Sequence, residues 1–349
     1  MQARELEREA LHGLPSLMAM LLDVPAEAIE QRPGSSDGRG FDAVVEAGGR
    51  RWLVKAKSSS GPGVVAAAAD QLRRLRESAD DGVPLLVVPY MTPAGSKTAV
   101  DEGLNWIDLS GNACLRDADL YVYVEGRPNR FPPRGRPSTP FAPKSARASR
   151  VLLLDPWQWW RQKDLAEETR LDDGHLSRIV RRLDDDELLE HRGAKFRPRD
   201  PDVLLDAWAD DYRFGRHDIV SGHVTGSGVE LVAEMHRQLA HVGIAHAMTG
   251  LPAAWALGQH ARFRLASVYV DLDPRSAADA IGLRRGEKGA NVQLLGPDDE
   301  GVLAGSRELD GYPCVSPVQV YLDLLNLPER AHEAADQLRA DGLLWKPRG

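Results

Sequence analysis

The sequence predicts an α/β protein of several domains, and three observations lead to this fold class. The chain has 349 residues, which is enough for two or three domains that each bury a core of their own. Short apolar strand patterns alternate with helix patterns on either side of a central segment. That segment, residues 127–199, has 17 basic and 11 acidic residues, although the net charge of the whole chain is −8. We therefore expect a basic helical domain between two acidic α/β domains.

The first domain is expected to span residues 1–126. Two of its strands, at 41–47 and 51–57, are separated by a Gly-Gly pair, which is typical of a two-residue hairpin turn. The apolar spacing predicts further elements in alternation. These are a helix at 3–22, a helix at 64–79, a strand at 83–90, a helix at 94–104, and strands at 105–111 and 120–126.

Proline-rich stretches mark the expected domain boundaries. Residues 127–144 are rich in Pro, Arg and Ser, and proline at this density blocks helices and sheets, so we expect an extended basic linker. Pro198 and Pro201 mark a second boundary, which places a C-terminal α/β domain at 200–349. Its expected elements are a helix at 226–243, a strand, turn and helix at 245–258, a strand at 265–273, and helices at 315–327 and 329–344.

The segment 145–199 predicts three short helices followed by two strands that turn at Gly193. Asp172 or Asp173 is expected to cap the third helix, because a carboxylate accepts hydrogen bonds from the first free N–H groups of a helix. The apolar residues of the third helix have the i, i+3, i+4, i+7 spacing of one buried face. They are Leu176, Ile179, Val180 and Leu183.

Polar and basic residues gather on the rest of that third helix and on the two strands. On the helix they are His175, Ser177, Arg178, Arg181 and Arg182, and on the strands they are Arg192, Lys195 and Arg197. A helix of this size fits the major groove, where arginine contacts guanine edges or phosphates, and cations on the strands neutralise phosphates. We therefore predict double-stranded DNA as a partner. The alternative is a group of three helices whose basic face is only solvated.

The order of helix, helix-turn-helix and basic hairpin resembles the winged helix-turn-helix transcription regulators. The resemblance covers residues 145–199 and implies that the third helix reads DNA while the hairpin, or wing, contacts its backbone. A homodimer is expected, because two half-sites multiply specificity. The sequence departs from the pattern at Arg170, which follows the second helix where these motifs often have glycine.

The first strand pair resembles the restriction-endonuclease-like fold, in which an aspartate and an acid-x-lysine motif bind a divalent metal. Asp42 matches the aspartate, Lys57 the lysine, and Gln71 a glutamine that some members carry. Lys55 stands where the acid of the motif belongs, and an ammonium group there repels a metal and offers no acceptor. Glu46 shares strand parity with Asp42 and is a candidate replacement.

We therefore predict a degenerate nuclease-like site, with no metal, no cofactor and no enzymatic activity. The alternative is a metal-dependent nuclease of the restriction-endonuclease-like fold that the winged helix targets to DNA.

Three further patterns have both a functional and a structural interpretation. Asp108 and Asn112 suit a ligand site, but such residues more often satisfy a tight turn, which we expect here. Asp271 and Asp273 alternate on a strand as in a nucleotidyltransferase, although acids at a strand end are usually solvated. The five histidines between 217 and 246 lack the spacing of a zinc site.

Taken together, three features resemble the regulators grouped with the AbiEi-type antitoxins of type IV toxin–antitoxin systems. They are the nuclease-like start, the central winged helix and the tail "TGLPAAWAL…VYVDLD…VSPVQVYLDLLNLPERAHEAADQL". The resemblance spans most of the chain. It implies a DNA-binding repressor that regulates transcription of its own operon, with a toxin or other protein as a further partner.

The cysteines and the apolar runs of the sequence indicate the cellular compartment. Cys114 and Cys314 lie too far apart in sequence to suggest a metal motif or a disulfide framework, which favours a reducing cytoplasm. The first residues have no apolar signal core, and no run of about 18 apolar residues occurs. We expect a cytoplasmic protein with no membrane partner.

Overall fold

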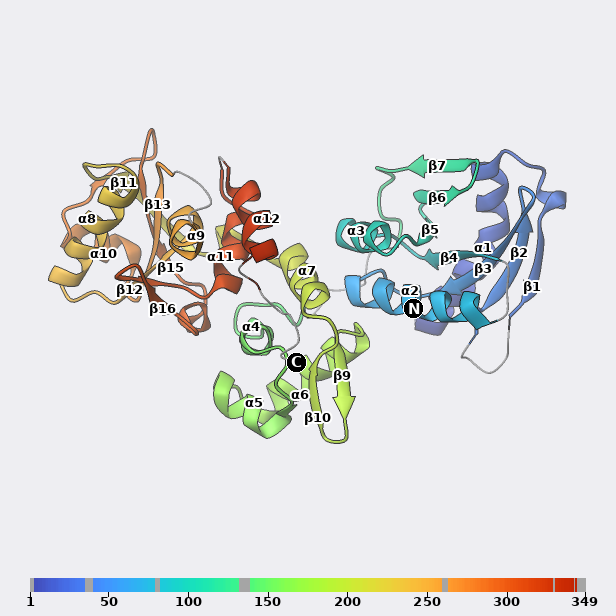
Figure 1. Ribbon diagram of the computed structural model, residues 1–349, viewed down its shortest axis with the longest axis horizontal. Helices are drawn as coiled ribbons and strands as arrows, with labels where there is room; N and C mark the ends of the chain where they lie inside the picture. The colour runs from blue at the N-terminus through green and yellow to red at the C-terminus, as the bar shows by residue number, and fades with distance from the viewer. Residues whose placement is uncertain are drawn as a thin grey trace. The chain divides into compact units, whose positions relative to one another are not determined.

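The computed structural model describes residues 3–34, 40–78, 82–131, 139–258, 263–328, 330–341 and 343. The chain divides into two compact units (Figure 1). The first unit consists of Met1–Ser138, Leu183–Leu189 and Asp202–Asp210, and the second of Thr139–Arg182, Glu190–Pro201 and Asp211–Gly349. Within the expected linker at 127–144, residues 132–138 lie outside the described residues.

The first unit is built on a seven-stranded sheet whose strands follow one another in chain order. Its elements are α1 (Ala3–Leu22), η1 (Ala26–Ala28), β1 (Glu30–Pro33), β2 (Ala43–Ala47), β3 (Arg50–Ala56), α2 (Pro62–Ser78), β4 (Val83–Val88), α3 (Pro93–Asp101), β5 (Asn105–Asp108), β6 (Ala113–Asp117) and β7 (Leu120–Val124). Strands β3, β4 and β5 are parallel, with α2 and α3 as the crossovers that parallel strands require, and the flanking pairs are antiparallel.

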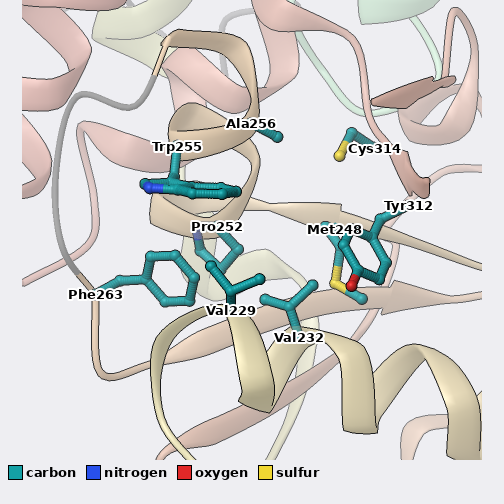
Figure 2. A pocket seen from close by; sticks show the side chains of 9 residues that line it. All are labelled: Val229, Val232, Met248, Pro252, Trp255, Ala256, Phe263, Tyr312 and Cys314. Atoms are coloured by element: carbon teal, nitrogen blue, oxygen red, sulfur yellow. The ribbon is translucent and has the colours of Figure 1, made fainter. Parts of the chain in front are cut away.

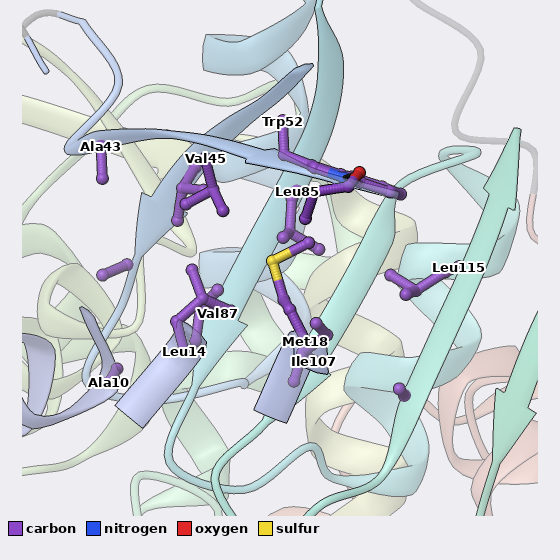
Figure 3. Packing of buried hydrophobic residues seen from close by; sticks show 14 of the residues in the cluster. Ala10, Leu14, Met18, Ala43, Val45, Trp52, Leu85, Val87, Ile107 and Leu115 are labelled. Atoms are coloured by element: carbon purple, nitrogen blue, oxygen red, sulfur yellow. Dashed lines mark hydrogen bonds between the residues drawn. The ribbon is translucent and has the colours of Figure 1, made fainter. Parts of the chain in front are cut away.

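Successive residues of the strands pack on opposite faces of this sheet, because side chains alternate along a strand. Val45 lies in the core that Leu14 and Met18 of α1 form with Trp52 of β3 (Figure 3). Val44, its neighbour in sequence, lies in the other core, against α2 and α3. The strands that carry Asp42, Lys55 and Lys57 near their ends are therefore held from both faces.

The turn between β2 and β3 has the conformation that its sequence predicts. Gly48 and Gly49 have φ angles of 60° and 71°. Two consecutive positive φ angles are the signature of the type I′ turn, whose twist matches that of the strands it joins. The expected hairpin is confirmed.

The basic segment forms the expected elements in the expected order, with one additional strand. The elements are α4 (Ala146–Leu154), β8 (Trp160–Arg161), α5 (Gln162–Thr169), α6 (Asp173–Asp185), β9 (Leu189–Arg192) and β10 (Lys195–Pro198). The strand β8, which the sequence pattern does not predict, completes a three-stranded sheet in the order β8-β10-β9. The four apolar residues assigned to the inner face of α6 are all buried.

A second seven-stranded sheet, of mixed direction, forms after the basic segment. The elements that follow β10 are α7 (Pro201–Asp211), η2 (Phe214–Arg216), β11 (Asp218–His223), α8 (Gly228–His241), β12 (His246–Thr249), α9 (Gly250–Gly258), β13 (Ala266–Val270), α10 (Pro274–Ala280), β14 (Arg284–Arg285), β15 (Val292–Gly296), η3 (Glu300–Leu303), β16 (Arg307–Leu309), β17 (Tyr312–Cys314), α11 (Pro317–Leu324) and α12 (Ala331–Asp341). The strand order is β14-β11-β15-β13-β12-β17-β16, and α9, α11 and α12 pack against one another.

A mixed α/β architecture with several sheets, as the sequence predicts, is therefore present. Within the ranges that the structure describes, no helix is both long enough and apolar enough to span a membrane.

Candidate nucleic-acid interface

Helix α6 begins at the cap that its sequence predicts. Asp172 Oδ1 accepts a hydrogen bond of 2.8 Å from the backbone N–H of His175. That hydrogen bond holds the pKa of the Asp172 carboxyl below its usual value. Of the two expected capping residues, Asp172 is therefore the cap, and Asp173 is the first residue of the helix.

The exposed face of α6 carries Arg178, Arg181 and Arg182, whose side chains point away from the buried apolar face. Arg178 Nε donates to the carbonyl of Gly174, 3.2 Å away, one turn earlier on the same helix. This bond ties the guanidinium to its own helix, and the side chain remains exposed. The three arginines form one cationic face, as predicted.

Two residues of α6 that were predicted to contact DNA are less exposed than the three arginines. His175 is half-buried, and its Nε2 is 3.0 Å from the Ser145 hydroxyl, which ties the start of α6 to the start of α4. Ser177 is half-buried as well. These two side chains lie at the border of the cationic face rather than at its centre.

Of the three residues in the hairpin of β9 and β10 that were predicted to contact DNA, two are exposed and one has partners within the protein. Arg192 and Lys195 are exposed on either side of the turn at Gly193, which has a φ of 61°. Arg197 forms an ion pair with Glu190 and lies over the rings of Trp157 and Trp159, with centroid distances of 5.3 and 4.5 Å. Arg197 is therefore a structural residue that fastens the hairpin to the loop before β8.

The predicted nuclease-like site contains an internal ion pair. Lys55 is only 7% exposed, and its Nζ lies 3.1 Å from Asp42 Oδ1 and 3.0 Å from the carbonyl of Gly40. The second oxygen of Asp42 accepts the backbone N–H of Ala56 at 2.8 Å. The Lys55 ammonium thus neutralises the Asp42 carboxylate directly.

The other residues of this predicted site do not converge on Asp42. Lys57 Nζ pairs with Glu187 Oε1 at 3.2 Å. Glu46 is exposed, and its strand neighbours are Glu30 and Arg51. Gln71 is half-buried on α2. Among the described residues, no group of three or more His, Cys, Asp or Glu side chains is arranged to hold a metal ion.

The turn after β5 has a structural role, as expected. The buried carboxylate of Asp108 accepts hydrogen bonds from the backbone N–H groups of Met91 and Asn112 and from the side-chain amide of Asn112, at 2.8 to 3.0 Å. These bonds satisfy the carboxylate inside the turn.

Three of the acids and histidines singled out in the C-terminal domain, Asp273, His236 and His246, contact side chains nearby. Asp273 caps α10, where it accepts the N–H and the hydroxyl of Ser276 at 2.8 Å. Asp271 is exposed. His236 Nδ1 lies 2.9 Å from His246 Nε2, a contact between two histidines ten residues apart that the sequence spacing does not indicate.

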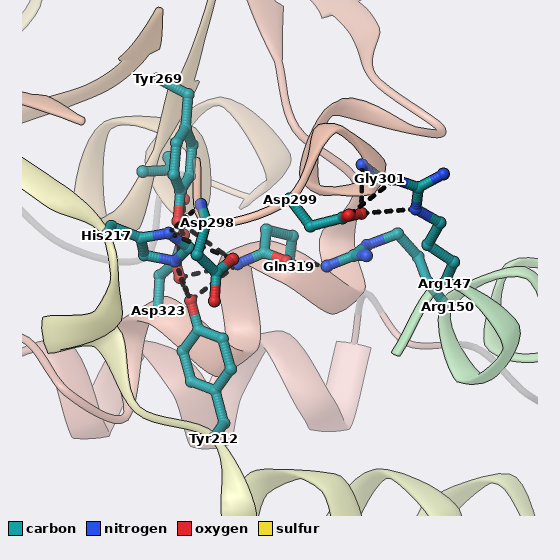
Figure 4. Close-up of polar contacts among 11 residues, drawn as sticks. Arg147, Arg150, Tyr212, His217, Tyr269, Asp298, Asp299, Gly301, Gln319 and Asp323 are labelled. Atoms are coloured by element: carbon teal, nitrogen blue, oxygen red, sulfur yellow. Dashed lines mark hydrogen bonds and ion pairs between the residues drawn. The ribbon is translucent and has the colours of Figure 1, made fainter. Parts of the chain in front are cut away.

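A fully buried carboxylate, Asp323 on α11, is the centre of a polar network (Figure 4). Its oxygens accept hydrogen bonds from Tyr212, Thr249, Tyr269 and Gln319. Burial raises the pKa of Asp323 above its ordinary value. Four donors around one carboxylate offset part of its desolvation cost.

Two arginines of α4 contact the C-terminal domain, and one of them, Arg150, joins this network (Figure 4). Arg147 binds both oxygens of Asp299 at 2.6 Å. Arg150, which is 2% exposed, donates from Nη2 to Gln319 Oε1 at 2.5 Å, and Gln319 in turn donates to Asp323. The first helix of the basic segment is thus fastened to the C-terminal domain by charge-assisted hydrogen bonds.

This network is absent from the sequence-based expectations, although one signal for it exists. Every residue of α11 from Val318 to Leu324 is buried, including Gln319 and Asp323. A helix that is buried on all sides and still carries a carboxylate must place that group among hydrogen-bond donors.

A small apolar pocket lies between α8, α9 and β17 (Figure 2). Its lining includes Trp255, Phe263 and Cys314, and its free volume is about 10 Å³, which is close to the space that a single water molecule needs. Burial raises the pKa of the Cys314 thiol to about 12, which disfavours the thiolate form that acts as a nucleophile. The pocket is a packing feature.

A family model matches residues 197–344. The family is described as transcriptional regulator, AbiEi antitoxin, of a type IV toxin–antitoxin system. This match supports the resemblance to AbiEi-type regulators for the C-terminal part of the chain, and the nuclease-like start lies outside it. No curated protein and no solved structure matches the chain.

Proposed function

We propose that the protein is a DNA-binding transcriptional regulator, a repressor of the antitoxin type, that reads operator DNA with a winged helix formed by residues 145–199. The cationic face of α6 is the observation that carries the proposal. Arg178, Arg181 and Arg182 are exposed together on a helix whose opposite face is buried. The family match at 197–344 supports a regulatory role independently.

The arrangement suits the chemistry of DNA recognition. Arginines on a helix in the major groove donate two hydrogen bonds to guanine O6 and N7, or bind phosphates. Arg192 and Lys195 at the tip of the hairpin supply further cations for the DNA backbone. A homodimer on two half-sites, and a toxin as a second partner, are part of the same proposal.

The test begins with selection of the genomic fragments that the protein binds, because the operator is not known. With the best fragment, Arg178→Ala and Arg181→Ala should each weaken binding by about 1–3 kcal/mol if the arginine contacts guanine. Gel-shift titrations at fixed salt measure this effect. Arg275→Ala, which removes an exposed arginine from α10, is the matched control and should bind as the wild type does.

A double variant lacking Arg178 and Arg181 that still binds the selected fragment with wild-type affinity would exclude α6 as the DNA-reading element. Failure to enrich any fragment would remove the proposal of operator binding as a whole.

We also propose that the N-terminal domain does not cut DNA. The support is the Lys55 ammonium, 3.1 Å from the Asp42 carboxylate, because a bound metal would have to displace or tolerate a buried positive charge there. The protein and its Asp42→Ala variant should show the same background cleavage of DNA with Mg²⁺ or Mn²⁺. Cleavage by the wild type that the variant loses would favour the alternative, a metal-dependent nuclease.

A further inference from the structure

A second cavity lies inside the second unit, next to the turn that precedes α6. Its volume is about 380 Å³, which is enough for a small organic molecule. It is formed by α4, the end of α5 with the following turn, and the segment around η3. Its charged lining residues are Arg147, Arg150, Glu168, Arg170 and Glu300.

Arg170 has an unusual backbone conformation for an arginine. Its φ and ψ are 54° and 37°, in the left-handed region, and its N–H caps α5. A residue with a Cβ atom loses about 1–2 kcal/mol in this conformation relative to the right-handed one, whereas glycine adopts it freely. Backbone strain of this kind is a reason to look for a role of the side chain.

The Arg170 side chain is exposed at the cavity, and within the described ranges no acceptor binds its guanidinium. The other two arginines of the lining are engaged. Arg150 donates to Gln319, and Arg147 holds Asp299 through two bonds and Glu300 through Nη1 at 2.9 Å. The Glu300 side chain is 65% exposed, so this outer ion pair adds little stability and can exchange its carboxylate for another anion.

The cavity also offers an acceptor. Glu168, two residues before Arg170 in the sequence, is exposed and also lines the cavity. A bare polyanion would be repelled by Glu168, whereas an anion that also carries hydroxyl or amino groups can donate to it. The charges therefore suit a ligand with an anionic end and a hydrogen-bond-donor end.

We infer that this cavity is a binding site for a small organic anion that carries a phosphate or carboxylate together with hydrogen-bond donors, and that Arg170 is its main contact. Phosphorylated nucleosides and acidic amino acids share this chemistry. Arg170 ends α5 and begins the short turn that leads to α6 at Asp173, so an occupant contacts the turn that sets the position of the cationic face. This last step, the coupling to DNA, rests on the proposed function, whereas the binding site does not.

Isothermal titration of the full chain without DNA tests the site. The probes are the four nucleoside 5′-monophosphates in one arm and L-glutamate and L-aspartate in the other, each at millimolar concentration. We expect saturable binding in one arm, which identifies the source of the anion. Arg170→Gly should weaken that binding about tenfold or more, the loss of one charge-assisted contact, and should leave the melting temperature unchanged or raised because glycine suits the backbone. Arg275→Ala is again the matched control.

Absence of binding by every probe, or equal binding by Arg170→Gly and the wild type, would overturn the proposed site. A separate titration of the selected DNA fragment, with and without the bound probe, tests the coupling. An unchanged DNA affinity removes the coupling and leaves the site in place, and a protein that binds no DNA fails the proposed function without affecting the titration of the probes.

Discussion

Single side chains determine the charge of one site in the N-terminal domain and one site in the C-terminal domain. Lys55 replaces the expected acid, and its ammonium neutralises Asp42 from inside the protein at 3.1 Å. In the C-terminal domain, His217 is 4% exposed and bound on both ring nitrogens. Its Nδ1 accepts the N–H of Asp298 at 3.0 Å, and its Nε2 lies 2.8 Å from the Tyr212 hydroxyl. These contacts fit a neutral ring.

The stability of the protein should therefore depend on the protonation of His217. Burial lowers the pKa of His217 below its ordinary value of 6.5. The unfolded state consequently binds the proton more readily, so the contribution of His217 is complete above pH 6.5 and is lost as the pH falls below it, by at most about 1.4 kcal/mol per pH unit. Denaturant unfolding at pH 7.5, 6.5 and 5.5 measures this.

His217→Asn keeps an acceptor near the Asp298 N–H and removes the titrating ring. Nearby carboxyl groups, including Asp323 and Asp298, titrate in both proteins, so the comparison of the two slopes isolates the histidine. The variant should lose less stability on acidification than the wild type. Parallel slopes for the two proteins would contradict a role for His217.

Among the elements, the β2–β3 hairpin and α6 are determined locally and α11 is not. Glycines with positive φ make the hairpin, and Asp172 begins α6 through a bond to His175, three residues away. Helix α11 instead carries Asp323, which has Gln319 of the same helix as one partner and takes its other three from elements more than 50 residues distant. Two of these are Tyr269 on β13 and Tyr212 after α7.

The β2–β3 hairpin allows a test of how much a left-handed backbone conformation contributes to the stability of one element. A Cβ atom at Gly49 would meet no atom within 4 Å, but the residue has a φ of +71°. Gly49→Ala should therefore lower the free energy of unfolding by about 1 kcal/mol through backbone strain alone. Gly61, before α2, also has open space and no left-handed φ, so Gly61→Ala is the control and should change stability by less than about 0.5 kcal/mol. Equal effects of the two substitutions in urea unfolding would contradict this explanation.

At the scale of the whole molecule, charge is concentrated where the proposed function needs it. The chain carries −8 overall, yet the segment 127–199 has six more basic than acidic residues. Part of this excess of basic side chains is not available to DNA, because Arg147, Arg150 and Arg197 already have partners inside the second unit. The cations left for phosphates are fewer than the sequence count suggests.

The salt dependence of DNA binding measures how many of these cations contact phosphates. Each contact adds about 0.9 to the slope of log K against log salt concentration. Lys195→Ala should reduce the slope by about one, since Lys195 is exposed at the tip of the hairpin. Titrations of the selected fragment between low and moderate salt give the slope, and Arg275→Ala should leave it unaltered. A slope that Lys195→Ala does not change would place the hairpin away from the DNA.

The sequence predicts correctly the elements whose pattern lies within a few neighbouring residues. It predicts incompletely the elements that depend on partners far away in the chain. The helix at 3–22, the hairpin and the apolar face of α6 all follow from spacing within one element. The strands β1, β6, β8, β11, β14, β15, β16 and β17 were not predicted, because their hydrogen-bond partners, rather than their own few residues, define them. Of the predicted DNA-contacting residues, Arg178, Arg181, Arg192 and Lys195 are exposed, and Arg197 is engaged with Glu190 and two tryptophans.

The sequence by itself determined the mixed α/β class, the basic centre, the buried and exposed faces of α6, and Asp172 or Asp173 as its cap, because each depends on residues close together in the chain. Only the tertiary structure decided which charges are available. In the folded chain Lys55 pairs with Asp42, and Arg150 is buried in a network with Gln319 and Asp323. Arg170, in contrast, remains exposed at a cavity beside α6. Charge pairing depends on distance in space, and the distance between residues 150 and 319 is set by the packing of whole helices and sheets.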